Sequence, residues 1–329
     1  MARPQILFKQ GHPLISVVIP TRNRPDLVQR AVHSVLNQSF SDFEIIVVID
    51  GADWQTSQAL REIGDPRLRT VELEQTVGGS EARNTGVRAA QGEWLALLDD
   101  DDEWMPDKLT KQIAVAEQSK YRYPIVATAL IARSPRADFL WPRKPPRYPL
   151  SEYLFVRNSL FQGEGVLQTS TLLTKRELLL NVPFTFGLRR HQDWDWILRA
   201  GNAEGAGVEF IPEALAIWHI DDPLSPLKNN YHWSYSLEWI RANRNLVTPR
   251  AYAGLVAVTL SAQAAWQRDW KAFWPLLREI FRGRPRLMDL ALFLAMWFIP
   301  RRIRQLVRSR MSRPKAAVLR AAAEAQPGQ

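Results

Sequence analysis

The residues of this sequence best suited to chemistry are four consecutive aspartates, Asp99, Asp100, Asp101 and Asp102. They follow an apolar run at 93–98 that predicts a buried strand. Side chains alternate along an extended backbone, so Asp99 and Asp101 would point the same way. Such a pair offers the hard oxygen ligands that Mg²⁺ and Mn²⁺ prefer, and a bound cation would offset the repulsion between the carboxylates. The alternative is a solvated strand end that leads into a helix.

Further polar residues follow other predicted strands. Thr21 comes directly after the β-branched run at 14–20, and Asp50 closes the run that begins at Phe43. Asp50 precedes a glycine, and an Asp-Gly pair is commonly only a turn. Arg22 and Arg24 lie in the loop after the first strand, where they could serve a diphosphate or simply be loop residues. Arg83 lies on a predicted helix before the acidic residues, and a solvated helix face is its alternative role.

The elements that would position these side chains alternate between strand and helix. Apolar runs predict strands at 14–20, 43–51, 67–73, 93–98 and 123–133, and helical spacing predicts helices at 25–38, 53–64, 80–92 and 106–118. This alternation predicts a parallel sheet with helices on both faces. Ligands of such sheets bind beyond the carboxyl ends of the strands, which is where the polar residues lie.

Composition narrows the class of protein. The chain has 329 residues, 46% of them hydrophobic, which is enough for a sizeable core. It has no cysteine, which excludes disulfides, zinc–thiolate sites and thiol nucleophiles. The first residues lack the features of a signal peptide, so we expect a cytoplasmic protein. A net charge of +9 favours an anionic partner, such as a phosphorylated ligand or an acidic lipid surface.

Several motifs, in order, resemble the family 2 glycosyltransferases of the GT-A fold. They are PTRNR after the first strand, Asp-Gly after the second, ARNTG on the helix at 80–92, DDDDEW after the fourth strand, and PDKL. The resemblance is close over 14–110 and looser to about 225. It implies a Rossmann-like, mostly parallel sheet flanked by helices, with a C-terminal helical extension. It also implies an enzyme that transfers a sugar from a nucleotide-sugar, here a UDP-sugar, with inversion.

The resemblance assigns roles on the donor side. Asp99 would face the ribose or the metal, and Asp101 would ligate a divalent Mg²⁺ or Mn²⁺. The residues expected to bind the nucleotide-sugar are Pro20, Thr21, Arg24, Asp50, Arg83, Asp99 and Asp100. One departure is that the family often has Asp-Asp-Gly-Ser where this chain has Ile-Asp-Gly-Ala at 49–52. Asp50 therefore remains as the expected base contact.

On the acceptor side, the resemblance implies that Asp193 is the catalytic base. The family usually has Glu-Asp before a helix, and this chain has Gln192 followed by Asp193. Asp195 is two residues further, so it would face another side of the helix. The alternative is a helix N-terminus that favours acids. His219, after the strand-like run at 214–220, would be a further metal ligand, or a structural histidine.

We expect four segments along the chain. They are an arm at 1–13, a GT-A domain at 14–225 with a nucleotide-sugar half (14–133) and an acceptor half (134–225), a helical region at 226–312, and a tail at 313–329. The stretch from Ser134 to Pro149 is rich in proline and basic residues, which predicts a loop. The segment from Trp233 to Phe281 looks helical.

The apolar run at 287–300 is followed by a strongly basic one. It is shorter than the ~20 residues that span a bilayer, and it contains Asp289. We expect an interfacial helix that meets anionic lipid through 282–313, and the alternative is a core helix with a solvated basic tail. Nucleic acid is not an expected partner, because no recognised motif accompanies the charge.

These observations favour a metal-dependent, inverting glycosyltransferase. Its acceptor would be a glycan or a lipid-linked glycan in surface polysaccharide or glycolipid synthesis, and it would lie peripherally on the inner face of the cell membrane. One alternative is a sugar-nucleotidyltransferase, which needs a glycine-rich loop where this chain has IPTRNRPD. The other is a non-catalytic scaffold bound to the membrane.

Overall fold

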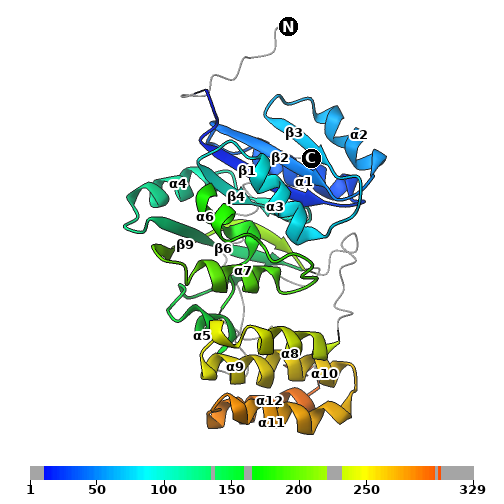
Figure 1. Ribbon diagram of the computed structural model, residues 1–329, viewed down its shortest axis with the longest axis vertical. Helices are drawn as coiled ribbons and strands as arrows, with labels where there is room; N and C mark the ends of the chain where they lie inside the picture. The colour runs from blue at the N-terminus through cyan, green and yellow to red at the C-terminus, as the bar shows by residue number, and fades with distance from the viewer. Residues whose placement is uncertain (1–10, 135–137, 159–164, 221–231, 301–302, 305–329) are drawn as a thin grey trace. The chain divides into compact units, whose positions relative to one another are not determined.

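The computed structural model describes residues 11–134, 138–158, 165–220, 232–300 and 303–304. It divides the chain into two compact units (Figure 1). The sheet unit contains the described residues up to Trp141 and those from Leu167 to Ile220. The helical unit contains the described parts of 142–166 and 227–316. Parts of the expected arm at 1–13 and of the basic stretch at 301–313, and the whole tail at 313–329, lie outside the described residues.

The sheet unit is built on one mixed sheet with the strand order β3-β2-β1-β4-β8-β6-β9-β5, and β7 pairs with β6. The pairs β1–β2, β2–β3, β1–β4 and β6–β9 are parallel, whereas β8 and β5 run antiparallel to their neighbours. The strands are β1 (Ile15–Thr21), β2 (Phe43–Ile49), β3 (Leu68–Glu72), β4 (Trp94–Leu97), β5 (Glu103–Trp104), β6 (Tyr123–Arg133), β7 (Phe139–Trp141), β8 (Leu173–Lys175) and β9 (Ala206–His219).

The parallel pairs among β1, β2, β3 and β4 confirm the predicted parallel sheet. Every residue of β2 and β4 is buried, as expected of strands covered on both faces. The predicted loop from Ser134 to Pro149 is wrong in part. It contains β7, which forms an antiparallel pair with the end of β6. Strand β9 also begins well before the apolar run that predicted it, and most positions of its first half are partly exposed.

Helices of the sheet unit begin and end where the local sequence dictates. They are α1 (Pro25–Leu36), α2 (Trp54–Ile63), α3 (Gly79–Ala89), α4 (Lys108–Gln118), α6 (Arg176–Asn181) and α7 (Gln192–Ala200), with a 3₁₀ turn, η1 (Thr169–Thr171). Pro25 occupies the first turn of α1, and the Asp53 carboxylate caps α2 by accepting from the Thr56 amide at 3.1 Å.

Gly86 allows α3 to lie directly on the sheet. A Cβ at this position would overlap the side chains of Val18 on β1 and Val48 on β2. The helix therefore approaches the two strands more closely than a larger residue would permit. This close approach places Arg83 and Asn84, three and two residues earlier on α3, at the carboxyl end of the sheet.

The helical unit contains α5 (Leu150–Phe155), α8 (Trp233–Ala242), α9 (Pro249–Leu255), α10 (Ser261–Trp266), α11 (Phe273–Arg282) and α12 (Leu287–Phe298). A π-helical turn, η3 (Val256–Leu260), joins α9 to α10, and short 3₁₀ turns lie at η2 (Arg244–Leu246) and η4 (Trp270–Ala272). The prediction of helix from Trp233 to Phe281 is therefore confirmed in outline. Among the described residues, no helix is long and apolar enough to cross a membrane.

Candidate active site

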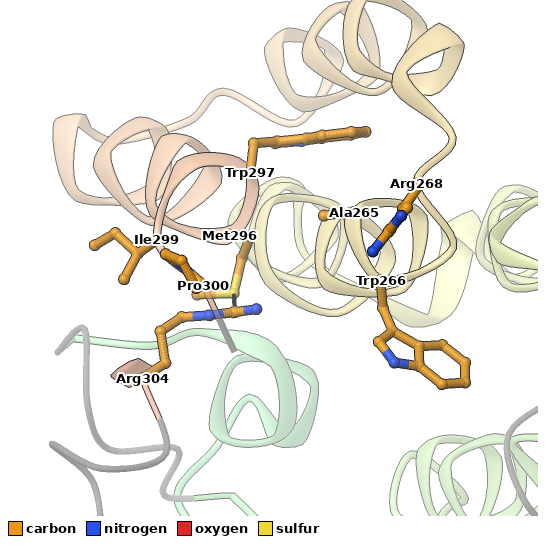
Figure 2. Close-up of a pocket in the computed structure, with 8 residues that line it drawn as sticks. All are labelled: Ala265, Trp266, Arg268, Met296, Trp297, Ile299, Pro300 and Arg304. Carbon is orange, nitrogen blue, oxygen red and sulfur yellow. Dashed lines mark hydrogen bonds between the residues drawn. The ribbon is translucent and has the colours of Figure 1, made fainter. Parts of the chain in front are cut away.

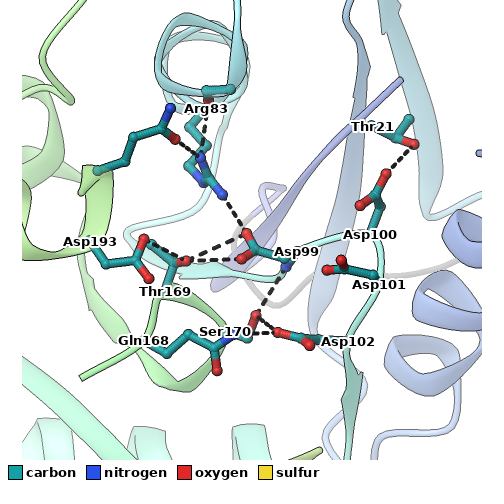
Figure 3. A network of polar contacts seen from close by, with 12 residues as sticks. Thr21, Arg83, Asp99, Asp100, Asp101, Asp102, Gln168, Thr169, Ser170 and Asp193 are labelled. Atoms are coloured by element: carbon teal, nitrogen blue, oxygen red, sulfur yellow. Dashed lines mark hydrogen bonds and ion pairs between the residues drawn. The ribbon is translucent and has the colours of Figure 1, made fainter. Parts of the chain in front are cut away.

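The four aspartates follow β4 and fan out in different directions (Figure 3). Asp100 turns toward the end of β1, where it accepts from the Thr21 hydroxyl at 2.8 Å and from the Arg24 guanidinium at 2.9 Å. Asp101 lies 3.5 Å from the same guanidinium group. The structure thus brings Thr21, Arg24 and the acids together, as the sequence-based interpretation expected of a donor site.

Asp102 points in the opposite direction and is fully buried. One carboxylate oxygen accepts from Ser170 at 2.6 Å and from Gln168 at 2.8 Å. The other oxygen has no hydrogen-bond partner among the described residues. Burial first, and then the charges of Asp99 and Asp101, raise the pKa of Asp102 well above its ordinary value.

Arg83 ties the donor-side acids to helix α7. Its guanidinium is buried and donates to the carboxylate of Asp99 and, at 2.6 Å, to the side-chain oxygen of Gln192. It also lies over the ring of Phe184, 5.5 Å from the centroid. Gln192 stands where the resembling family has an acid, so this chain offers Arg83 a neutral partner there. The positive charge of Arg83 is balanced by Asp99 and Asp193, which raise the pKa of Arg83 against the effect of its burial.

Thr169, on the turn η1, lies between the donor-side acid and the expected base. Its hydroxyl is 3.3 Å from one oxygen of Asp99 and 3.2 Å from Asp193 (Figure 3). Burial and the nearby charge of Asp99 raise the pKa of Asp193 to about 6, although Arg83 acts in the opposite direction. Burial likewise raises the pKa of Asp100 to about 6, in spite of Arg24.

The neighbouring acid on α7, Asp195, serves the fold. It accepts from Thr185 at 2.6 Å and from Arg199 at 2.7 Å, and it is 3% exposed. Asp193 and Asp195 therefore have different partners, and of the two only Asp193 approaches the acidic cluster. His191 precedes the helix with a left-handed backbone (φ 66°), and its ring stacks on Trp194 at 4.6 Å. Burial and Arg190 lower the pKa of His191 to about 3, so the imidazole is neutral at pH 7.

Two residues that were expected to contact a ligand, Asp50 and His219, instead contact other groups of the protein. The carboxylate of Asp50 accepts from the amides of Val77 at 2.7 Å and Gly78 at 3.0 Å, and so it fixes the loop that leads into α3. The His219 ring lies 2.7 Å from the carboxylate of Glu103, on the neighbouring strand β5. Pro20 is partly exposed near the end of β1. Each of these residues lies at the strand end that the sequence indicated, but its ligand role remains a prediction.

The donor set fits a divalent cation. One oxygen from each of Asp99, Asp101 and Asp102 lies within 4.8 Å of the others. All three are hard carboxylate ligands of the kind that Mg²⁺ and Mn²⁺ accept. The unpartnered buried oxygen of Asp102 provides a second observation, because a buried carboxylate without a partner is costly unless a positive group compensates it.

Sequence reasoning missed the turn at 168–170. Its polar side chains hold Asp99, Asp102 and Asp193 at once, yet nothing in the string Gln-Thr-Ser marks it as part of a site. The available signal was weak, namely four adjacent polar residues at 168–171 before the short apolar pair at 172–173. The turn contacts residues that are distant in the sequence, after β4 and on α7. Its role in holding the three aspartates therefore becomes visible only in the folded structure.

Comparison with known proteins gives the class of protein first. A solved mannosyltransferase from Pyrobaculum calidifontis, PcManGT in complex with GDP-Man and Mn²⁺, superimposes with a TM-score of 0.50 at 19% identity, covering 95% of this chain and 80% of that one. The fold is accordingly that of the GT-A glycosyltransferases. The chain belongs to glycosyl transferase family 2, whose family model matches residues 16–182.

Curated relatives agree with this assignment. The amylovoran biosynthesis glycosyltransferase AmsB of Erwinia amylovora is 30% identical over 71% of this chain and 79% of its own. The Escherichia coli enzyme named UDP-Glc:alpha-D-GlcNAc-diphosphoundecaprenol beta-1,3-glucosyltransferase WfgD is 27% identical over 60% of this chain and 75% of its own. The protein is therefore a glycosyltransferase. This excludes the two alternative classes, the sugar-nucleotidyltransferase and the non-catalytic membrane-bound scaffold.

Proposed function

We propose that this glycosyltransferase moves a sugar from a UDP-sugar to a hydroxyl group of a glycan or lipid-linked acceptor, with inversion and with the help of a divalent cation. The observation that carries the proposal is the contact through Thr169 between Asp99, on the donor side, and Asp193, on α7. The names of AmsB and WfgD support a role in the synthesis of cell-surface polysaccharide or glycolipid.

The donor would bind at the carboxyl ends of β1, β2 and β4. Arg24 and Arg83 supply positive charge for its diphosphate, and both are already held in place by aspartates. Asp50 lies directly after β2. Its carboxylate fixes the path of the loop at 76–78 by accepting from two backbone amides. The proposed donor-binding residues are Pro20, Thr21, Arg24, Asp50, Arg83, Asp99 and Asp100.

Asp101 would hold the cation, together with oxygens of Asp99 and Asp102. When bound, Mg²⁺ or Mn²⁺ would stabilise the negative charge of the departing nucleoside diphosphate. His219 is a candidate for the same group, and to join it the ring would have to leave the carboxylate of Glu103. The three acids alone already supply the oxygen ligands that these cations prefer.

Asp193 is the proposed catalytic base. A carboxyl group with a pKa of about 6 is ionised at pH 7, and its basicity is higher than that of an ordinary aspartate. It would accept the proton of the acceptor hydroxyl as the new C–O bond forms. The hydroxyl attacks the anomeric carbon on the face opposite the diphosphate, so the configuration inverts. Thr169 keeps Asp193 oriented, and the stacked pair of His191 and Trp194 offers a flat surface beside it for an acceptor sugar.

A lipid-linked acceptor would place the enzyme at the membrane where that lipid is made. We therefore propose a peripheral location on the inner face of the cell membrane. The name of WfgD, which includes a diphosphoundecaprenol acceptor, supports a lipid carrier. A carrier of that kind stays in the bilayer, so an enzyme that acts on its head group must work close to the lipid surface.

The test is a panel of nucleotide-sugars scored for donor hydrolysis and for thermal stabilisation with Mn²⁺. We expect stabilisation by UDP that requires Mn²⁺ in the wild type and is lost in Asp101→Ala. Asp107→Ala is the matched control, because Asp107 is an exposed acid six positions further along the chain, where its side chain is 58% exposed. Equal Mn²⁺-dependent stabilisation of wild type and Asp101→Ala would refute the metal role.

A further inference from the structure

The hairpin of α11 and α12 exposes an apolar face that the fold does not cover with described residues. On α12, Leu287, Ala291, Leu294 and Phe298 recur at helical spacing, and all four are exposed. The exposed fractions of the three larger side chains are 86%, 48% and 63%. The opposite side of α12 is equally apolar but packs inside the unit through Leu292, Phe293 and Trp297, among others. The alternative prediction, that this segment is a core helix, therefore holds for only one side of α12.

Helix α11 and the turn before it continue this face. Trp270, Trp274 and Phe281 are 56%, 65% and 59% exposed. The Trp270 ring lies 6.2 Å from that of Phe298 on α12, and 5.3 Å from that of Trp297. Between them, Phe273 contacts Trp274 on one side and Phe298 on the other. Ring contacts therefore join Trp270, Phe273, Trp274 and Phe298, and we call these four residues with the exposed side of α12 the aromatic face.

The charges around the aromatic face are almost all positive at the surface. Lys271 and Arg278 are exposed and have no ion-pair partner among the described residues, and Arg278 lies one turn after Trp274 on α11. One acid of this region, Asp269 beside Trp270, is 26% exposed and accepts a hydrogen bond from the Trp233 indole, and two others are buried. Glu279 is 3% exposed and paired with Arg241 and Arg282, and Asp289 is fully buried and paired with Arg286. The surface is thus apolar at its centre and basic around it.

A hollow lies against α12 and is lined by the buried Trp297, whose ring contacts Trp270 of the aromatic face (Figure 2). It has a volume of about 380 Å³. Its walls are apolar, with Trp266, Met296 and Ile299 among them, and two guanidinium groups, those of Arg268 and Arg304, also line it. Apolar walls with arginine at the edge suit an acyl chain that carries an anionic head group.

These features point to one occupant, and we infer that the aromatic face docks on the surface of an anionic lipid bilayer. Tryptophan and phenylalanine side chains prefer the membrane–water interface, and lysine and arginine beside them are attracted to acidic head groups. A second copy of the chain would bring the two basic rims together, and the basic segment at 305–320 would meet the same repulsion. This inference deepens the proposed function, since it names the surface that would hold the enzyme near a lipid-linked acceptor.

The test is co-sedimentation of the full-length protein with vesicles of phosphatidylcholine, alone or mixed with phosphatidylglycerol. We expect binding to the anionic vesicles. Trp274→Ser combined with Phe298→Ser should weaken it about tenfold or more, since it removes two interfacial anchors. Trp54→Ser is the matched control, because Trp54 is a 68% exposed tryptophan on α2 of the sheet unit. Circular dichroism melting shows whether each variant is folded.

A charge reversal provides a second variant that leaves the aromatic packing intact. Arg278→Glu should weaken binding to anionic vesicles about tenfold, whereas Lys120→Glu, an exposed reversal on the sheet unit, should leave it near the wild-type value. The inference is wrong if the wild type fails to sediment with anionic vesicles, or if both face variants bind like the wild type. It is also wrong if the face variants instead abolish a self-association seen by analytical ultracentrifugation. Hydrolysis of the UDP-sugar without vesicles reports separately on the proposed function.

Discussion

Glu279 in the helical unit and Asp102 in the sheet unit are both buried carboxylates, but their surroundings differ. Glu279 accepts from Arg241, Arg282 and the Tyr252 hydroxyl. Burial alone would raise its pKa, yet these donors outweigh burial and lower the pKa of Glu279 to about 2. Asp102 is held by the neutral donors Ser170 and Gln168 and lies beside other acids, so its pKa is raised.

The difference is the one expected between a carboxylate that stabilises the fold and one that serves a ligand site. In the helical unit, each buried acid described above has an arginine partner, and the ionisation of Glu279 stabilises the fold. At the end of β4 the acids outnumber the arginines near them, and the ionised cluster is under-compensated. Such an arrangement costs stability, and a bound cation would offset that cost.

The largest expected effect is the loss of transfer in Asp193→Asn. The amide cannot accept the proton of the acceptor hydroxyl, so transfer should fall about 10²- to 10⁴-fold. Donor binding should persist, as measured by the Mn²⁺-dependent thermal shift with UDP. Asp195→Asn is the control on the same helix, and it should reduce the melting temperature more than the activity, because Asp195 pairs with Arg199. Full transfer activity in Asp193→Asn would assign the base elsewhere.

Glu279→Gln tests the structural half of the comparison. Removing the charge of the buried Glu279 takes the partner from Arg241 and Arg282, which are 49% and 68% exposed, so the free energy of unfolding of the helical unit should fall by about 1–2 kcal/mol. Urea unfolding measures the loss. Glu238→Gln, an exposed change on α8, should have little effect. If the two variants were equally stable, the arginine pairs would contribute nothing measurable.

The pH dependence of the two units should have opposite signs when a chelator is present. Asp100 and Asp193 have folded pKa values of about 6, above the ordinary 3.8, so they bind protons on folding and stabilise the sheet unit as pH falls from 7 toward 4. The gain is at most about 1.4 kcal/mol per pH unit for each group. Glu279, with a lowered pKa, makes the helical unit less stable as pH falls below about 4.5.

Hydrogen exchange followed by mass spectrometry resolves the two units in this pH series. After correction for intrinsic exchange, protection of β1, β4 and α3 should increase between pH 7 and 5, while that of α8 and α11 stays constant. Addition of Mn²⁺ should remove the increase, since the cation takes the place of the protons. Parallel changes in both units would mean that the charge difference between them has no thermodynamic consequence.

Thr169→Val should have the smallest effect. Valine keeps the shape of the buried side chain but removes the hydroxyl between Asp99 and Asp193, so kcat should fall about tenfold, the equivalent of ~1.4 kcal/mol. That hydroxyl lowers the pKa of Asp193, and the acid limb of the pH profile should therefore move to higher pH. Thr169→Ser restores the hydroxyl and should restore both quantities. An unshifted profile would limit Thr169 to packing.

The elements that carry the donor side could be predicted because their sequence is periodic. The apolar runs before Thr21, Asp50 and Asp99 indicated the strands and hence the edge of the sheet where these residues meet. Whether the Asp50 carboxylate faces a ligand or backbone amides depends on the path of the loop at 73–78. The sequence of this loop has no periodic pattern from which its path could be predicted. The turn η1 and the antiparallel strand β8 were also beyond prediction, since three-residue elements are specified by their neighbours rather than by their own pattern.

Gly86 has a consequence for how inactive variants of this enzyme would be interpreted. Any larger residue there must push α3 away from Val18 and Val48, and Arg83 would move with the helix, away from Asp99. A genetic screen for loss of transfer would therefore recover changes at Gly86 beside changes at the acids. Sorted by phenotype, this glycine would be counted among the active-site residues, although its own atoms stay in the packing layer between helix and sheet.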